Sequence, residues 1–312
     1  MRTLPAIGTA TAAVTVFALV AGCSSTGTPG NDDTSNQSSQ ATQTAVGAPT
    51  AANSASTAGS ANTTATPAPG AKQVAPPPIG AKFDYQLGGA YPVPAGVQVI
   101  SRDSTADPAA GVYNICYINA FQAQPGTESW WKSNHPDLLL TDADGAPVID
   151  KDWNEQLLDV STDAKRAALA KVEFAWIDAC AAKGFQATEG DNLDSYQRSN
   201  GRLDAGQTVA FATLLAQHAH ADGLAIGQKN TTELLDQRRQ IGFDFAVAEQ
   251  CGATGECDQY ASAYAGRVLD IEYDDAGFAK ACQGSKSGMS VVRRDRDVSP
   301  AGSPKYVYRQ CP

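Results

Sequence analysis

The chain has 312 residues and a formal net charge of −10. The surplus of acidic over basic side chains, with no Lys/Arg-rich stripe, excludes nucleic acid as a partner, because neutralising phosphates requires clustered basic groups. No Gly-rich phosphate loop follows a strand-like segment, and no Cys/His pattern has metal-ligand spacing. We therefore expect neither an organic cofactor nor a metal ion.

Residues 1–22 have the pattern of a bacterial lipoprotein signal peptide. Arg2 precedes an apolar stretch at residues 6–19, which is too short and too rich in Ala and Thr for a membrane span. The stretch ends in "LVAGC", which is similar to the lipobox whose cysteine, here Cys23, carries a lipid. We expect export and a lipid anchor on the outer face of the bacterial cell membrane. The alternative is an ordinary signal peptide with an unmodified Cys23, which would leave a periplasmic or extracellular protein.

Residues 23–80 are predicted to form a disordered linker. The segment consists almost entirely of Ser, Thr, Ala, Asn, Gly and Pro, and this composition buries too little apolar surface to offset the entropy of ordering. The remaining residues, 81–312, are enough for one large domain. The membrane is therefore expected to contact the protein only through the N-terminal lipid.

Strand-like and helix-like patterns alternate through residues 81–312. Eight short segments have the length and composition of strands, at residues 83–87, 97–103, 112–120, 185–191, 224–230, 243–250, 267–274 and 289–295. Helical patterns lie at residues 163–184, 204–223, 231–240, 258–265 and 278–284. Gly184 and Gly223 follow the two long helices, where glycine favours termination.

This alternation predicts an α/β fold of the TIM type, a (β/α)8 barrel in a single domain. Residues 122–163 interrupt the pattern and are expected to form an insertion over the barrel mouth. Trp130 and Trp131 of this insertion either cap a cleft or anchor the insertion to the barrel.

Six cysteines remain besides Cys23, and an even number in an exported chain indicates disulfide bonds. The alternative, a metal–thiolate site, lacks the usual closely spaced cysteine pair. The expected pairs are Cys251–Cys257, which close a short loop, and then Cys282–Cys311 and Cys116–Cys180.

Polar side chains end nearly every predicted strand. In a TIM-type barrel the carboxyl ends of the strands form the active-site face, so these side chains should converge on one mouth. Glycoside hydrolysis uses paired carboxylates, and Asp191 and Glu249 are placed to flank one bond. A cleft that only binds a ligand is the alternative. The strand-end residues expected at the mouth are Asp103, Asn119, Asp191, Lys229, Asn230, Glu249, Gln250 and Glu272.

Four segments resemble glycoside hydrolase family 114, the endo-α-1,4-polygalactosaminidases. They are "EGDNLDSY", "AHADGLAIGQKN", "FDFAVAEQCGATGECD" and "RVLDIEYDD", in the order and with the spacings of the family. The resemblance implies a TIM-type barrel that cleaves α-1,4-linked galactosamine polymers with retention of configuration. It also implies that Asp191 is the nucleophile and Glu249 the general acid/base.

The other acids and the tyrosines near these motifs are expected to bind the substrate. Carboxylates would receive the ammonium groups of deacetylated amino sugars, and tyrosine rings would stack on sugar faces unless they only pack the barrel. In addition to the strand-end residues, this set comprises Tyr85, Tyr117, Glu189, Asn192, Asp194, Tyr196 and Tyr273.

We therefore expect a monomeric, surface-tethered glycoside hydrolase whose partner is an amino-sugar polysaccharide. A catalytically inactive carbohydrate-binding lipoprotein of the cell envelope is the main alternative. A structural protein that uses the barrel as a spacer is a third.

Overall fold

The computed structural model describes residues 73–284 and 288–312, which belong to one compact unit. The predicted signal peptide (1–22), the lipidation of Cys23 and the linker as far as residue 72 lie outside the described residues. Within the two described ranges, no helix is both long and apolar enough to cross a bilayer.

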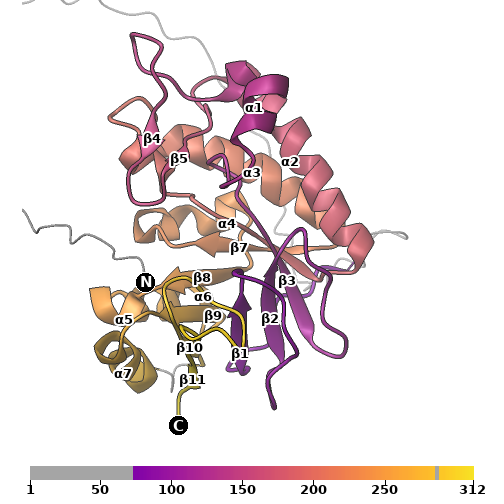
Figure 1. Ribbon diagram of the computed structural model, residues 1–312, viewed down its shortest axis with the longest axis vertical. Coiled ribbons are helices and arrows are strands. Elements are labelled where there is room, and N and C mark those ends of the chain that lie inside the picture. The colour runs from indigo at the N-terminus through magenta and orange to yellow at the C-terminus, as the bar shows by residue number, and fades with distance from the viewer. Residues whose placement is uncertain (1–72, 285–287) are drawn as a thin grey trace, which may run out of the picture. The chain divides into compact units, whose positions relative to one another are not determined.

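Eight parallel strands form a nearly closed barrel, which confirms the predicted TIM-type fold (Figure 1). Each strand pairs with the next, and a ninth strand, β11, pairs antiparallel with β10. The strands are β1 (Phe83–Gln86), β2 (Val99–Asp103), β3 (Tyr113–Ile118), β6 (Ala187–Gly190), β7 (Ala225–Lys229), β8 (Phe245–Glu249), β9 (Val268–Glu272), β10 (Ser290–Arg294) and β11 (Tyr308–Gln310). Where β1 and β10 lie side by side, the buried Arg294 forms an ion pair with Asp84 at 3.0 Å.

Helices pack against the outward faces of the strands. They are α2 (Asp163–Lys183), α3 (Ala205–Ala221), α4 (Arg238–Ile241), α5 (Cys251–Thr254), α6 (Cys257–Tyr264) and α7 (Asp275–Gly284), with 3₁₀ helices η2 (Ser195–Arg198) and η3 (Thr232–Gln237). The Thr162 side chain caps α2, and Asp204 and Gln207 form a capping box at the start of α3. Gly184 ends α2 at φ 93°, a left-handed conformation that glycine adopts easily.

Alternate side chains along each parallel strand point into the barrel. On β8, Phe245 and Val247 belong to the cluster that fills the barrel, whereas Ala246 and Ala248 pack against helices. The other inward strand residues include Phe83, Tyr85, Val99, Ile115, Ala187, Ala225, Leu269, Ile271 and Val292. This register decides which of the strand-end residues face the barrel mouth.

Gly227 of β7 leaves the space that the Phe245 ring occupies. A Cβ atom on Gly227 would lie 2.7 Å from Cε2 of Phe245, whose side chain is fully buried. Gly227→Ala should therefore lower the free energy of unfolding by about 1–3 kcal/mol, as overpacking of a core does. Chemical denaturation measures the loss. The double variant Gly227→Ala/Phe245→Leu should recover part of it, and a single variant as stable as the parent would contradict this packing.

Residues 119–162, between β3 and α2, include the predicted insertion. They hold α1 (Glu128–Asn134), the 3₁₀ helix η1 (Pro136–Leu138) and a short hairpin of β4 (Ile149–Asp150) and β5 (Glu155–Gln156). Trp131 is fully buried, and its ring centroid lies 5.2 Å from that of Trp130 and 5.8 Å from that of Trp176 on α2. The tryptophan pair thus anchors the insertion to α2 and does not cap the cleft.

Three disulfide bonds join elements of the barrel, in the expected pairs. One ties β3 to α2, one closes the loop after β8, and one ties α7 to the C-terminal segment. They are Cys116–Cys180, Cys251–Cys257 and Cys282–Cys311.

The chain packs on the barrel before residue 81, where the domain was predicted to begin. Val74 contacts the apolar cluster inside the barrel, and the Tyr113 hydroxyl donates a hydrogen bond to the carbonyl oxygen of Ala75 at 2.6 Å. Residues 73–80 therefore do not belong to the linker, although their Pro-rich composition resembles it.

Candidate active site

The inward register brings ionisable side chains to the mouth of the barrel. On β6, Ala187 points inward, so Glu189 and Asp191, two and four residues later, continue the same face. The same alternation places Lys229 four residues after Ala225 on β7, and Glu249 two residues after Val247 on β8. The acidic "EGD" segment therefore lies at a strand end because two of its carboxylates belong to the inward face.

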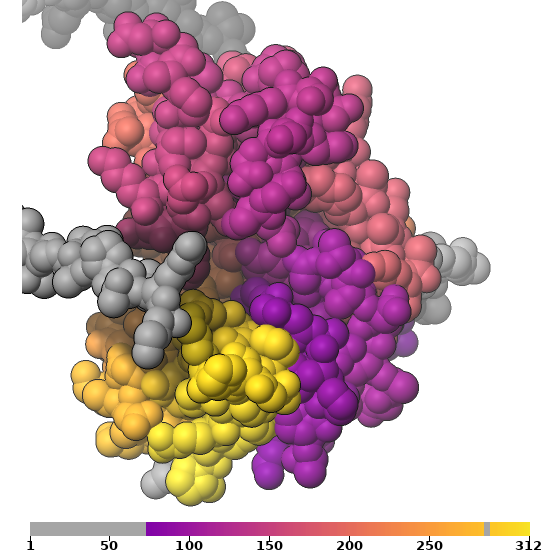
Figure 2. Space-filling model, viewed as in Figure 1, coloured from indigo at the N-terminus to yellow at the C-terminus, as the bar shows by residue number. Residues whose placement is uncertain are grey.

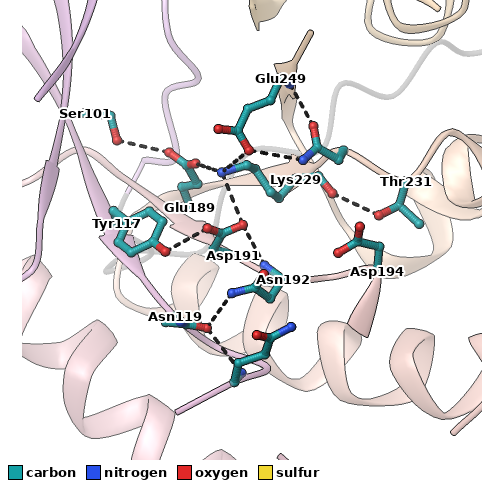
Figure 3. A network of polar contacts seen from close by, with 12 residues as sticks. Ser101, Tyr117, Asn119, Glu189, Asp191, Asn192, Asp194, Lys229, Thr231 and Glu249 are labelled. Atoms are coloured by element: carbon teal, nitrogen blue, oxygen red, sulfur yellow. Dashed lines mark hydrogen bonds and ion pairs between the residues drawn. The ribbon is translucent and has the colours of Figure 1, made fainter. Parts of the chain in front are cut away.

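Lys229 lies at the centre of the site and forms ion pairs with three carboxylates (Figure 3). Its Nζ lies 3.0 Å from Glu189 Oε1, 3.2 Å from Asp191 Oδ1 and 3.3 Å from Glu249 Oε2. Burial alone would lower the pKa of Lys229, but these three carboxylates raise it well above its ordinary value. Lys229 is thus a permanent cation that holds Asp191 and Glu249 toward each other.

Asp191 is held as a carboxylate of fixed orientation. The Tyr117 hydroxyl donates to its Oδ2 at 2.7 Å, and the backbone N–H of Asn192 donates to its Oδ1 at 2.6 Å. Burial would raise the pKa of Asp191, but the Lys229 ammonium and these two hydrogen bonds outweigh it and lower the pKa below its ordinary value. An ionised, oriented carboxylate is the form that nucleophilic attack requires.

Glu249 is oriented by two neighbouring side chains. The Asn230 Oδ1 accepts the backbone N–H of Glu249 at 2.7 Å, and the Asn230 Nδ2 donates to Glu249 Oε2 at 3.3 Å. The Tyr273 hydroxyl donates to the other oxygen, Oε1. The Glu249 side chain remains 21% exposed, so it can meet a ligand in the cleft.

Glu189 lies beneath the two mouth acids and is fully buried. Its Oε1 accepts hydrogen bonds from Tyr85 at 2.7 Å and Lys229 at 3.0 Å, and its Oε2 accepts one from Ser101 at 3.0 Å. Burial raises its pKa despite the Lys229 ammonium. Because it has no opening to the cleft, Glu189 positions Lys229 and is not the substrate-binding acid that the sequence analysis expected.

The tyrosines expected to stack on sugar rings contribute hydroxyl groups instead. Tyr85 and Tyr117 are 1% and 9% exposed, so their rings are packed in the barrel, and their hydroxyls bind the carboxylates of the site. A buried tyrosine hydroxyl needs a polar partner, and the inward acids provide one. Tyr196 lies in η2, packs against the apolar cluster under the helices, and does not line the cleft.

A cleft of about 310 Å³ opens above these acids. Figure 2 shows the surface hollowed between the insertion and the C-terminal segment. Among the predicted residues, the cleft is lined by Tyr85, Asp103, Tyr117, Asp191, Asn192, Asp194, Lys229, Asn230, Glu249 and Tyr273. The predicted carboxylate pair therefore faces open space wide enough for a ligand.

Glu272 was expected at the mouth, and this prediction is wrong. Leu269 and Ile271 occupy the inward face of β9, so Glu272 points outward and is fully buried against the helices. Its Oε1 accepts the backbone N–H of Gly252 at 2.6 Å, where α5 begins. Glu272 thus binds the start of a helix, which favours an acceptor for its free N–H groups.

Asn119 and Gln250 also do not line the cleft. Asn119 is buried, accepts from Asn192 Nδ2 at 2.9 Å, and donates to Glu155 Oε2 at 2.7 Å. Gln250 adopts a left-handed conformation (φ 63°) at the start of α5. Both follow a strand end, but the chain has already turned away from the barrel axis there.

Half of the residues that line the cleft were not predicted as site residues, and they include Glu155, Trp153, Arg198 and Arg296. Glu155 and Trp153 come from the hairpin of the insertion, Arg198 from η2, and Arg296 from the segment after β10. Trp153 is 47% exposed, and the Arg296 guanidinium lies 5.2 Å from the centroid of its ring. This cation–π contact joins the insertion to the segment after β10. Only Arg198 had a sequence signal, since it lies four residues after Asp194 and pairs with it.

Two groups of side chains in the described residues have the proximity of metal ligands, and neither lies in the cleft. One contains Cys251 and Cys257, whose sulfurs are joined in a disulfide and are not thiolates. The other joins Asp178 of α2 to His218 and Asp222 at the end of α3. The cleft chemistry is therefore derived from its carboxylates and Lys229.

A TIM-type barrel with two oriented carboxylates facing one cleft is the arrangement that glycoside hydrolysis uses. The sequence profile of glycoside-hydrolase family GH114 matches residues 63–312, and the chain belongs to this family. Its Asp191 and Glu249 lie in the segments that resemble that family.

Solved structures that are similar to this chain include two glycoside hydrolase structures. Ega3 of Aspergillus fumigatus, in complex with galactosamine, has a TM-score of 0.63 and 22% identity over 77% of this chain and 98% of its own. The glycoside hydrolase domain of PelA from Pseudomonas aeruginosa has a TM-score of 0.52 and 16% identity over 71% of this chain and 96% of its own. At these identities the likeness shows the fold. No curated protein sequence matches the chain.

Proposed function

We propose that the protein is a surface-tethered hydrolase that cleaves α-1,4-linked galactosamine-type polysaccharide with retention of configuration. Asp191 is the nucleophile and Glu249 the general acid/base. The observation that carries this proposal is that one buried ammonium, Lys229 Nζ, pairs with both carboxylates at the floor of one cleft. The tether rests on the lipobox-like "LVAGC" that ends at Cys23.

The geometry favours retention over inversion. Asp191 Oδ1 lies 3.2 Å and Glu249 Oε2 lies 3.3 Å from Lys229 Nζ. The separation between these two oxygens therefore cannot exceed the sum of the two distances. Retaining enzymes hold their carboxyl groups roughly 5–5.5 Å apart, and inverting enzymes about 6.5–9.5 Å apart to admit a water. The largest oxygen–oxygen separation that the two ion pairs allow equals the lower end of the inverting range, so the pair is closer than most inverting pairs.

The reaction proceeds in two displacements. Asp191 attacks the anomeric carbon and forms a glycosyl ester, while the bond to the leaving oxygen breaks and Glu249, which enters this step in its protonated form, gives that oxygen its proton. Glu249 then takes a proton from water, and the water oxygen displaces Asp191 from the sugar. Both side chains return to their starting state, and two inversions restore the original configuration.

Charge supports an amino-sugar polymer as the substrate. Besides the catalytic pair, Asp103, Asp194 and Glu155 line the cleft, and an acidic cleft attracts cationic ligands. The structure of Ega3, which resembles this chain in fold, contains galactosamine. A partly deacetylated α-1,4-galactosaminan, which carries ammonium groups along its length, is therefore the substrate proposed.

Incubation of the protein with this polymer tests the proposal. We expect short oligomers whose new reducing ends are α-anomers before mutarotation, detected by proton NMR within the first minutes. β-Anomers at the earliest times would contradict the retaining mechanism. If no amino-sugar polymer gives oligomers, although the protein binds them, the inactive carbohydrate-binding lipoprotein replaces the hydrolase as the function.

A further inference from the structure

Glu155 is a buried carboxylate at the side of the catalytic cleft, outside the pair that performs the chemistry. It lies on β5 in the hairpin of the insertion, is 6% exposed, and lines the same cleft as Asp191. The reaction described above needs no third carboxylate. Burying a carboxyl group costs free energy, so we expect a buried acid that lines a ligand site but takes no part in the bond cleavage to have another function.

Neutral amides are the partners of Glu155 in the described part of the chain. The Nδ2 atoms of Asn119 and Asn192 donate to its Oε2 at 2.7 and 3.4 Å. Among the described residues, none donates a hydrogen bond to its Oε1 and no cation forms an ion pair with it. Burial raises the pKa of Glu155 to about 7 despite the bond from Asn119. The charged form is therefore costly until a cation arrives.

The other acids of the cleft already have partners. Asp191 and Glu249 share Lys229, and the remaining three are satisfied separately. Asp194 pairs with Arg198 at 2.6 Å, Asp297 pairs with Lys305 at 2.5 Å, and Asp103 accepts hydrogen bonds from Thr105 and Gln124 on its two oxygens. Glu155 is thus the buried carboxylate of the cleft, among the described residues, with an oxygen left for a ligand, whereas the second oxygen of Asp297 belongs to an exposed side chain.

The position of Glu155 indicates which part of a sugar would meet it. Asn192 connects it to the nucleophile, because the Asn192 backbone N–H binds Asp191 while its side chain binds Glu155. Figure 3 shows Asn192 and Asn119 on the opposite side of Asp191 from Glu249. In a 2-amino sugar the nitrogen is on the carbon next to the anomeric carbon that Asp191 attacks. Glu155 binds both amides and so lies on the side of Asp191 away from Glu249, in the cleft that would hold this carbon.

We propose that Glu155 Oε1 accepts the ammonium group of the sugar bound at Asp191, and so makes the enzyme select free-amine residues over N-acetylated ones. This inference rests on the proposed function. An ammonium group supplies the missing cation, whereas an acetamido group is neutral and leaves the buried carboxylate unpaired. A hydrogen bond to a charged group that is lost in this way changes affinity by roughly tenfold or more.

Binding to a variant with strongly slowed hydrolysis tests the inference without requiring turnover. In full-length protein carrying Glu249→Gln, calorimetry would measure the dissociation constants of α-1,4-linked galactosamine and N-acetylgalactosamine oligomers. Adding Glu155→Gln keeps an acceptor for Asn119 and removes the charge. We expect the preference for the free-amine oligomer to fall roughly tenfold or more. Asp144→Asn, which removes an equal charge at an exposed position of the same insertion outside the cleft, is the matched control and should keep the preference.

The pH dependence gives a second readout. The groups that face Glu155 are Asp150 of β4, Asp191 after β6, and Arg198 of η2, which itself pairs with Asp150 at 2.6 Å. Because the ammonium binds the carboxylate form, affinity for the free-amine oligomer should rise as the pH rises toward the Glu155 pKa of about 7. The rise ends near about pH 8, where a sugar amine of ordinary basicity loses its proton. Glu155→Gln should flatten this rise.

Three outcomes separate the inference from the function on which it rests. Equal losses of affinity for both oligomers, or an unchanged preference, would overturn the role of Glu155 even if the parent protein cleaves the polymer. A parent protein that binds and prefers the free amine but does not cleave it would refute the hydrolase and leave the inference standing. Near-ultraviolet circular dichroism identifies a misfolded variant, and Glu155→Asp, which keeps the charge, should then recover part of the preference.

Discussion

Lys229→Met should cost more stability than any other single substitution in the barrel. Removing the ammonium leaves Glu189, Asp191 and Glu249 in a buried site without their shared cation. Removing one partner of a buried ion pair costs about 3–5 kcal/mol, because an uncompensated buried charge remains. Urea denaturation near pH 7 measures the loss. Lys305→Met is the control, since Lys305 is largely exposed and its pairing with Asp297 is a surface contact.

The cost of Lys229→Met should depend on pH in a defined direction. In the parent, Asp191 has a lowered pKa, so its contribution to stability is present above its unfolded pKa and is lost as the pH falls through the folded pKa. In the variant, the ammonium no longer opposes the effect of burial on Asp191, so the pKa of Asp191 in the folded state moves above its pKa in the unfolded state. The variant should therefore regain stability as the pH falls from about 7 toward about 5. A deficit that is constant with pH would contradict the ion-pair account.

Lys229→Arg is not expected to rescue the site. The Nζ atom is 1% exposed and lies within 3.3 Å of all three carboxylates and 2.9 Å from the Tyr85 hydroxyl. A planar guanidinium is larger and directs its donors in a fixed fork, so it cannot take the place of this compact cation without moving the strands. Activity should be lost in both variants, because Asp191 and Glu249 lose the compact ammonium group that pairs with both of them and orients them.

Much of the fold was accessible from the sequence because strands and helices have different apolar periods. All eight predicted strands are present, and Thr162 and Asp204 cap the two long helices as short polar residues do. The insertion was recognised by its lack of such a period. Its contribution to the cleft, Trp153 and Glu155, could not be predicted, because an irregular segment has no register to indicate where its side chains point.

The sequence analysis selected site residues by their position at strand ends, and this succeeded mainly where the residue also lies on the inward face of its strand. Asp191 and Glu249 share a face with the inward residues Ala187 and Val247. Side chains alternate along β9, so the residue after the inward Ile271, which is Glu272, is expected on the outward face. The structure places it there. The hydroxyl contacts of the tyrosines were not accessible in this way, because they depend on which inward side chain of another strand stands opposite, as Glu189 of β6 does for Tyr85 of β1.

Asp191→Asn should abolish hydrolysis, by a factor on the order of 10⁴ or more, as loss of a nucleophile does in other enzymes. The amide oxygen can still accept from Lys229 and the Asn192 N–H, and the amide nitrogen can donate to the Tyr117 hydroxyl oxygen, so the site keeps its shape. Because the variant removes a carboxylate whose pairing with Lys229 stabilises the fold, its stability must be measured beside its activity. Asp258→Asn, on the exposed surface of α6, is the control for loss of one negative charge.

Glu249→Gln should produce a different pattern, and the difference assigns the two roles. General acid catalysis contributes roughly 10²–10⁴-fold, and it matters only when the leaving oxygen needs a proton. On the polysaccharide, Glu249→Gln should lose this factor, while an aryl glycoside with an acidic phenol as leaving group should still form the ester with Asp191. An initial burst of phenol followed by slow turnover is expected, since the second step lacks its base. If instead Asp191→Asn gave the burst and Glu249→Gln gave none, the roles of the two acids would be exchanged.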